Sequence, residues 1–276
     1  MSQSRFILAK FSVILAITLA FSSITIPIQG QTESGRVQNS SKKSLLIFPP
    51  PQKKGQGNQG RPTHRTSGGG HRRDDCLELI ALVPGEGEIE LYDGECDPNS
   101  KGLSQSFSAH TVEEFPSLWF YIPEFLEFET MEVELAIVDE QRKLLSKQRI
   151  LLYQDFGVIE VPLTYPLQPN KEYRWIFSLL MNPESRSENP QVEGWLKRVP
   201  ETKTTCQLKA EGSQWDCITH YVNNSIWHDA LTALAKLRRE APQDTTLEAQ
   251  WSSLLSSVGL EAITEVPIND CCSLDK

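Results

Sequence analysis

The chain has 276 residues, of which 39% are hydrophobic and 23% are charged. This composition is typical of one globular domain with appendages, and it excludes a chain that is disordered throughout. The net charge is −9, and an acidic chain is a poor partner for nucleic acid, so we expect no nucleic-acid binding.

The first residues have the pattern of a secretory signal peptide, which we place at residues 1–30. Arg5 and Lys10 supply positive charge, residues 11–28 carry no charge, and Gly30 ends a segment suited to cleavage. Ser, Thr and Pro interrupt the apolar run, so an uncleaved membrane anchor is the weaker alternative. We therefore predict an exported protein, periplasmic or extracellular, whose mature chain has no membrane span.

Residues 31–73 are predicted to be a disordered, basic linker rich in Gly and Pro. Residues 42–73 hold eight Lys or Arg and no acidic residue. Such a segment buries too little apolar surface to offset the entropy lost on ordering. Its charge suits an anionic polymer of the envelope or the acidic remainder of the chain, and a solvated spacer is the alternative.

Seven short strands are predicted within residues 74–204, which we expect to form an antiparallel immunoglobulin-like β-sandwich. The strands are expected at residues 77–83, 118–122, 131–137, 143–153, 158–163, 173–180 and 192–199. Tyr173 follows a turn that contains Pro169 and precedes Trp175 by two positions. This is the spacing of a tyrosine corner, in which the hydroxyl bonds back to upstream backbone.

Residues 205–276 are predicted to form a C-terminal helical hairpin with cysteine-rich ends. Trp227 and Leu231 begin a row of apolar residues at helical spacing that stops at Pro242, and Asp244 can cap a second helix. A single helical pair cannot bury its own apolar face. We therefore expect the hairpin to pack on the sandwich.

Six cysteines in an exported chain favour disulfides over a metal site. A Cys206–Cys217 bond is favoured because residues 211–213 have the composition of a turn. We expect one of the last two cysteines to attach the tail to the body. The predicted disulfide cysteines are Cys76, Cys96, Cys206, Cys217, Cys271 and Cys272.

Three aromatic residues are candidates for a binding surface: Trp119, Tyr121 and Trp195. On an exposed sheet face they would stack on sugar rings. Packing in the core is the favoured alternative, because each ring buries a large apolar area.

No residue pattern points to catalysis, so we predict a protein that is not an enzyme and has no cofactor. Glu132 and Glu134 alternate with apolar residues and are expected on a hydrated face rather than as the carboxylate pair of a glycosidase. His228 is expected at a surface or an interface rather than as a base. Serine-nucleophile and phosphate-loop motifs do not occur in the sequence.

An ordered series of short motifs follows the chain: residues 79–84, 116–123, 173–175, 192–195, 227–231, 257–261 and the pair Cys271-Cys272. The series resembles the cyanobacterial family named domain of unknown function 928, over residues 44–272. The resemblance implies no activity and brings no catalytic residues. Family members often have a cysteine where this chain has residues 180–182, so the partner of Cys76 stays open, with Cys96 as an alternative.

These features predict a non-enzymatic binding or scaffold module of the cell envelope that recognises a protein or a glycan. One alternative is a glycan hydrolase that uses surface carboxylates, which requires two acidic groups in one cleft. The other is a purely structural envelope protein, whose loss would alter envelope integrity without any soluble ligand.

Overall fold

The computed structural model describes residues 44–50, 79–85, 109–123, 130–153, 156–182, 189–200, 213–269 and 271. All of these residues belong to the unit formed by residues 43–276. The predicted signal peptide lies outside them. Among the described residues, no helix is long and apolar enough to cross a membrane.

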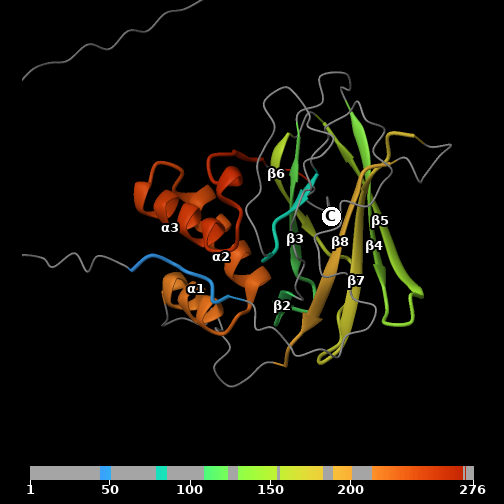
Figure 1. Ribbon diagram of the computed structural model, residues 1–276, viewed down its shortest axis with the longest axis horizontal. Coiled ribbons are helices and arrows are strands. Elements are labelled where there is room, and N and C mark those ends of the chain that lie inside the picture. The colour runs from blue at the N-terminus through green and yellow to red at the C-terminus, as the bar shows by residue number, and fades with distance from the viewer. Residues whose placement is uncertain are drawn as a thin grey trace, which may run out of the picture. The chain divides into compact units, whose positions relative to one another are not determined.

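The described residues form two sheets followed by a helical region (Figure 1). The four-stranded sheet has the order β1-β3-β6-β9 and the five-stranded sheet has the order β2-β8-β7-β4-β5. The strands are β1 (Ile80–Ala81), β2 (Ala109–Thr111), β3 (Ser117–Ile122), β4 (Met131–Val138), β5 (Leu144–Leu152), β6 (Gly157–Pro162), β7 (Glu172–Leu179), β8 (Gln191–Arg198) and β9 (Ile268–Asn269). The helices are α1 (Gln214–Asn223), α2 (Trp227–Glu240), α3 (Thr245–Ser256) and the 3₁₀ helix η2 (Glu261–Ile263).

Each predicted strand overlaps one observed strand, and two short strands were not predicted. The predicted strands pair antiparallel, whereas β2 and β9 each join a sheet edge in parallel, β2 beside β8 and β9 beside β6. Strands of two or three residues are too short to show a period of two. The prediction of a mainly β protein with helices at its C-terminal end is therefore confirmed.

The two sheets pack face to face around one apolar core. Phe120 of β3 stacks on Phe177 of β7 with ring centroids 3.9 Å apart, and its edge meets Trp175 at 5.6 Å. Leu118 and Ile122 point the same way as Phe120 and are equally buried. Alternate residues of β3 therefore face the five-stranded sheet.

The opposite face of the four-stranded sheet is covered by the helices (Figure 1). Trp119 of β3 donates its indole N–H to the Thr232 hydroxyl of α2 at 3.0 Å. Trp227 of α2 donates its own indole N–H to the Leu82 carbonyl at 2.8 Å. Because β3 is buried on both faces, its sequence is a nearly unbroken apolar run. The molecule is thus built in three layers: five-stranded sheet, four-stranded sheet and helices.

The predicted tyrosine corner is present at the start of β7. The backbone N–H of Gln168 donates a hydrogen bond to the Tyr173 hydroxyl at 3.0 Å. Asn170, in the turn between them, has a φ of 63°, a backbone conformation that asparagine tolerates better than most residues. The bond fixes the connection that leads into the central strand of the five-stranded sheet.

Two features of the chain differ from the predicted domain organisation. Residues 44–50 were assigned to the disordered linker, but Leu46 and Phe48 lie in the core of the helical layer. The mean composition of residues 31–73 hid the apolar run at residues 45–48. The helical region also has three α-helices instead of a hairpin, because α1 precedes the predicted pair and is capped by reciprocal hydrogen bonds between Ser213 and Asp216.

Candidate functional site

The outer face of the five-stranded sheet carries a band of charged side chains and one tryptophan. Strand register places Leu144, Val138, Arg174 and Trp195 in a single row across β5, β4, β7 and β8. On β4, β7 and β8 the row is flanked by residues buried in the core, such as Ile137, Tyr173 and Leu196, so the row faces away from the core. We call the following residues the outer band: Glu132, Glu134, Lys147, Arg149, Arg174, Glu193 and Trp195.

Ion pairs connect the charged members of the outer band. Glu134 contacts Lys147 Nζ at 2.9 Å and Arg149 Nε at 3.2 Å. Arg149 Nη1 also contacts Glu132 at 3.2 Å, and a separate pair joins Arg174 to Glu193. These pairs bridge neighbouring strands and hold long side chains in one arrangement.

The expected hydrated face is therefore observed for only one of the two predicted glutamates. The side chain of Glu132 is 42% exposed, whereas that of Glu134 is only 8% exposed. Glu134 is shielded because two cationic side chains from β5 lie across it. A carboxylate enclosed by cations differs from the apolar pocket in which a glycosidase keeps its acid protonated.

Trp195 differs from most of the other tryptophans in its surroundings. Trp119, Trp175, Trp227 and Trp251 are at most 1% exposed, while Trp195 is half-buried. In strand register, Trp195 lies directly opposite Arg174, whose guanidinium is paired with Glu193. A half-buried indole beside charged groups offers a ligand both an apolar surface and hydrogen-bonding groups.

The three predicted binding aromatics do not form a single surface. Trp119 is buried, as the favoured alternative of core packing expected, because the helices cover its ring and its indole N–H donates to the Thr232 hydroxyl. Tyr121 is half-buried and packs against the same helical core. Only Trp195 reaches the outer face of the five-stranded sheet.

Both cysteines that the structure describes, Cys217 and Cys271, are disulfide-bonded. No disulfide is defined between two described residues, and Cys76, Cys96, Cys206 and Cys272 lie outside the described part of the chain. The Cys206–Cys217 pairing therefore stays a prediction.

A second polar cluster is enclosed between the first turn of α2 and β2. The Asp229 carboxylate accepts a hydrogen bond from the Val112 N–H at 3.4 Å. Burial raises the pKa of Asp229 to about 7, and the hydrogen bond from Thr111 and the nearby Glu113 carboxylate act in opposite directions on it. The pKa of this nearly buried carboxyl group therefore lies close to neutral pH.

The neighbouring His228 is buried between α2 and the sheet. It was expected at a surface or an interface, and the structure shows that it is not at the surface. Its side chain is enclosed because α2 packs onto β2 and β3 on this side, leaving it 1% exposed. Burial, together with the smaller effect of charge repulsion from His110, lowers the pKa of His228 to about 3. Among the described residues, no group of three or more His, Cys, Asp or Glu is arranged to hold a metal ion.

Comparison with known protein families identifies the family of this chain. A model of the family described as Domain of Unknown Function, DUF928, matches residues 63–268. The chain belongs to the DUF928 family. The match spans both sheets and the three α-helices, and therefore includes the outer band and the Asp229 cluster. The cyanobacterial origin implied by the motifs stays a prediction.

Other comparisons give this DUF928 protein no functional assignment. Comparison with curated proteins finds no match. A solved structure described as the crystal structure of the C-terminal domain of wzt is 12% identical and covers 55% of this chain and 92% of its own, with a TM-score of 0.24. A likeness at this level carries no argument about fold or ligand.

Sequence reasoning missed the cationic half of the outer band. Lys147 and Arg149 alternate along their strand with the same period as Glu132 and Glu134 along theirs. Opposite charges at matching spacing on two strands joined by a tight turn indicate cross-strand pairs. This signal was present in the sequence around the turn at residues 139–142.

Proposed function

We propose that this DUF928 protein is an exported, non-enzymatic binding module of the cell envelope that recognises its ligand through the outer band. Its two facing sheets are proposed to be immunoglobulin-like, with the helical layer as a brace. The observation that supports the proposal most is the position of Trp195, half-open on the outer face beside the Arg174–Glu193 pair.

The chemistry of the outer band favours a glycan over an apolar ligand. The Trp195 indole provides an apolar face, while Arg174 provides donors and Glu193 provides acceptors for hydroxyl groups. The Glu134 ion pairs hold the neighbouring side chains in place before binding. A surface fixed on strands loses less conformational entropy on binding than one formed by loops.

Two variants test the proposal. Each protein is titrated with polysaccharide fractions of the envelope, and calorimetry measures the binding affinity. Trp195→Ala is expected to weaken binding at least about 10-fold, because it removes the stacking surface. Trp215→Ala is the matched control, since Trp215 is also half-buried but lies in α1. Equal binding by the wild type and both variants would contradict a role for the outer band.

The same wild-type and variant proteins also distinguish the two alternative functions from the proposed one. A hydrolase that uses surface carboxylates would release reducing sugar and lose turnover in Glu132→Gln or Glu134→Gln. A purely structural protein would bind no fraction, while deletion of the gene would still weaken the envelope. A binding module predicts saturable binding without turnover.

A further inference from the structure

The charged side chains of the outer band balance one another. Its cations and its carboxylates are equal in number: Lys147, Arg149 and Arg174 against Glu132, Glu134 and Glu193. Each cation lies in an ion pair with at least one of these carboxylates. The outer band therefore carries no net charge, although it is rich in charged groups.

The same balance holds on both sides of Trp195. Along β8, Glu193 precedes Trp195 by two positions and Lys197 follows it by two, so the three side chains share the outer face. In strand register, Arg174 lies opposite Trp195 and Glu172 lies opposite Lys197. The charged neighbours of the indole on these two strands are thus two cations and two carboxylates.

The carboxylates of the outer band are shielded by the cations that they hold. The side chain of Glu193 is 11% exposed and that of Arg174 is 24% exposed, so their ion pair is largely withdrawn from solvent. Lys147 and Arg149 shield Glu134 in the same way. An acidic ligand that took a cation from either carboxylate would leave a shielded negative charge without its partner. Breaking a shielded pair in this way is strongly unfavourable.

Neutral polar groups can bind such a pair without separating it. A guanidinium has more N–H donors, and a carboxylate has more acceptor sites, than one ion pair uses. Arg174 contacts Glu193 through Nη2, while its Nε has no hydrogen-bond acceptor among the described residues. A sugar hydroxyl both donates and accepts a hydrogen bond, so it suits the donors and acceptors that remain.

We propose that the outer band selects an uncharged glycan and discriminates against acidic glycans, such as polymers of uronic acids or of phosphorylated sugars. This inference rests on the proposed function and names the ligand class of that same site. Trp195 supplies the stacking surface, and the paired Arg174 and Glu193 supply hydrogen bonds to hydroxyl groups. Discrimination comes from the carboxylates, because Glu193 repels the acidic group that Arg174 would otherwise attract.

The test uses the full chain and two probes from the envelope. Anion-exchange chromatography separates the envelope polysaccharide into an unretained, uncharged fraction and an acidic fraction that salt elutes. Calorimetry measures the affinity of each fraction for the wild type and for Trp195→Ala, and the part lost in Trp195→Ala is assigned to the outer band. An acidic polymer held by the basic residues 42–73 is thereby not counted. The outer band is expected to bind the uncharged fraction at least about 10-fold more tightly than the acidic fraction.

Two further measurements locate the discrimination. The Trp195-dependent affinity for the uncharged fraction should change less than about 2-fold between roughly 50 mM and 500 mM NaCl, because binding neutralises no net charge. Glu193→Gln frees the Arg174 guanidinium, so the affinity for the acidic fraction should rise at least about 10-fold and fall again with salt.

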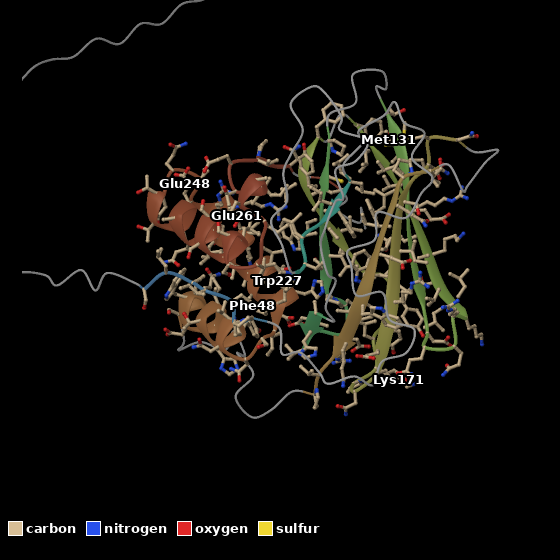
Figure 2. The ribbon with its side chains drawn as sticks, viewed as in Figure 1. Phe48, Met131, Lys171, Trp227, Glu248 and Glu261 are labelled. Atoms are coloured by element: carbon tan, nitrogen blue, oxygen red, sulfur yellow. The ribbon has the colours of Figure 1, made fainter. Side chains whose placement is uncertain are left out.

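Glu248→Gln is the matched control, because it makes the same change of charge at an exposed position of α3. Figure 2 shows Glu248 on the helical layer, whereas Met131 and Lys171 lie at the two ends of the five-stranded sheet. This control should leave both affinities within about 2-fold of the wild type.

The outcomes separate this inference from the proposed function. Equal or tighter Trp195-dependent binding of the acidic fraction would overturn the inference and leave the proposed function in place. Binding of neither fraction, or binding that Trp195→Ala leaves unchanged, would overturn both. A Glu193→Gln protein that stays folded by circular dichroism and gains no affinity for the acidic fraction would also overturn the inference. If that variant does not fold, the wild type decides, since a steep loss of affinity with salt would show that charge drives binding.

Discussion

Two surfaces of this protein use the same side-chain types with different outcomes. On the outer face of the five-stranded sheet, Trp195 lies beside an Arg–Glu pair and stays half-open. On the helix-facing side of the four-stranded sheet, Arg239 of α2 lies 5.1 Å above the Trp119 ring and pairs with Glu160 of β6. There the helices complete the contact and bury the tryptophan.

The two tryptophans differ in what lies over each ring among the described residues. At Trp119, a cation, an apolar helix face and the Thr232 hydroxyl cover the ring together. At Trp195 the charged groups come from the same sheet, Arg174 from the neighbouring β7 and Glu193 from β8 itself. We propose that a ligand would lie over Trp195 as α2 lies over Trp119 on the helix-facing side of the four-stranded sheet. The following predictions test this comparison, beginning with the largest effect.

Trp119→Ala is expected to lower the free energy of unfolding by about 4 kcal/mol, the cost of removing a large core side chain. Trp195→Ala should cost no more than about 1 kcal/mol, because part of that ring is already in water. Urea denaturation followed by circular dichroism measures both. Equal losses would mean that the two tryptophans are both structural.

The Asp229 cluster predicts a pH dependence that appears only when one member is removed. The pKa of Asp229 is higher in the folded state, so its contribution to stability is lost as pH rises from about 4 to about 7. The pKa of His228 is lower in the folded state, so its contribution is lost as pH falls from 6.5 to about 3. Between about pH 4 and 6.5 the two slopes oppose each other.

Asp229→Asn should therefore make unfolding free energy rise with pH by about 1.4 kcal/mol per unit over this window. His228→Gln should make it fall at a similar rate, because Asp229 then acts alone. Denaturant titrations at a series of pH values measure these slopes. Parallel pH profiles for the wild type and both variants would show that the pair does not titrate with folding.

Gly194→Ala tests the packing directly beneath the outer band. An added Cβ would lie 2.3 Å from the Trp175 ring, which faces Gly194 across β7 and β8. Overpacking of this kind is expected to cost about 2 to 3 kcal/mol in unfolding free energy. Thermal denaturation measures the loss, and an unchanged midpoint would mean that Trp175 is free to move aside.

The smallest effect separates the two glutamates of the outer band. Glu134→Gln should lower unfolding free energy by about 1 to 2 kcal/mol, since it leaves two cations around a shielded neutral group. Glu132→Gln should change it by less than about 0.5 kcal/mol, as expected for an exposed pair. Urea titrations at low and high salt measure the difference, and equal effects would contradict the shielding of Glu134.

The sequence was sufficient for the larger strands because their apolar residues either alternate or, as in β3, form a short unbroken run, and because each segment ends at a turn. Tyr173 and Pro169 also predicted a specific hydrogen bond that the structure contains. Short strands such as β2 and β9 depend on long-range pairing, which no local pattern encodes. The docking of Leu46 and Phe48 was missed for the same reason, since its partners are about two hundred positions away in α3 and α2.

The candidate site was predictable only in part. Trp195 was identified as an aromatic on a strand, but burial decides between core and surface, and Trp119 has the same local pattern. The sequence does not show that the helices pack on the four-stranded sheet and, among the described residues, not on the five-stranded one. The burial of Glu134 depends on its contacts with Lys147 and Arg149. Which residues of β5 lie opposite Glu134 became known only from the observed register between β4 and β5.

The most direct test of the outer band is an NMR titration of the indole N–H signals of the six tryptophans with an envelope polysaccharide. We predict that the Trp195 signal shifts in a saturable way while the signals of Trp119, Trp175, Trp227 and Trp251 stay in place. A shift of the Trp119 or Trp227 signal with Trp195 unmoved would contradict the account, because the ligand would then bind at the helical layer.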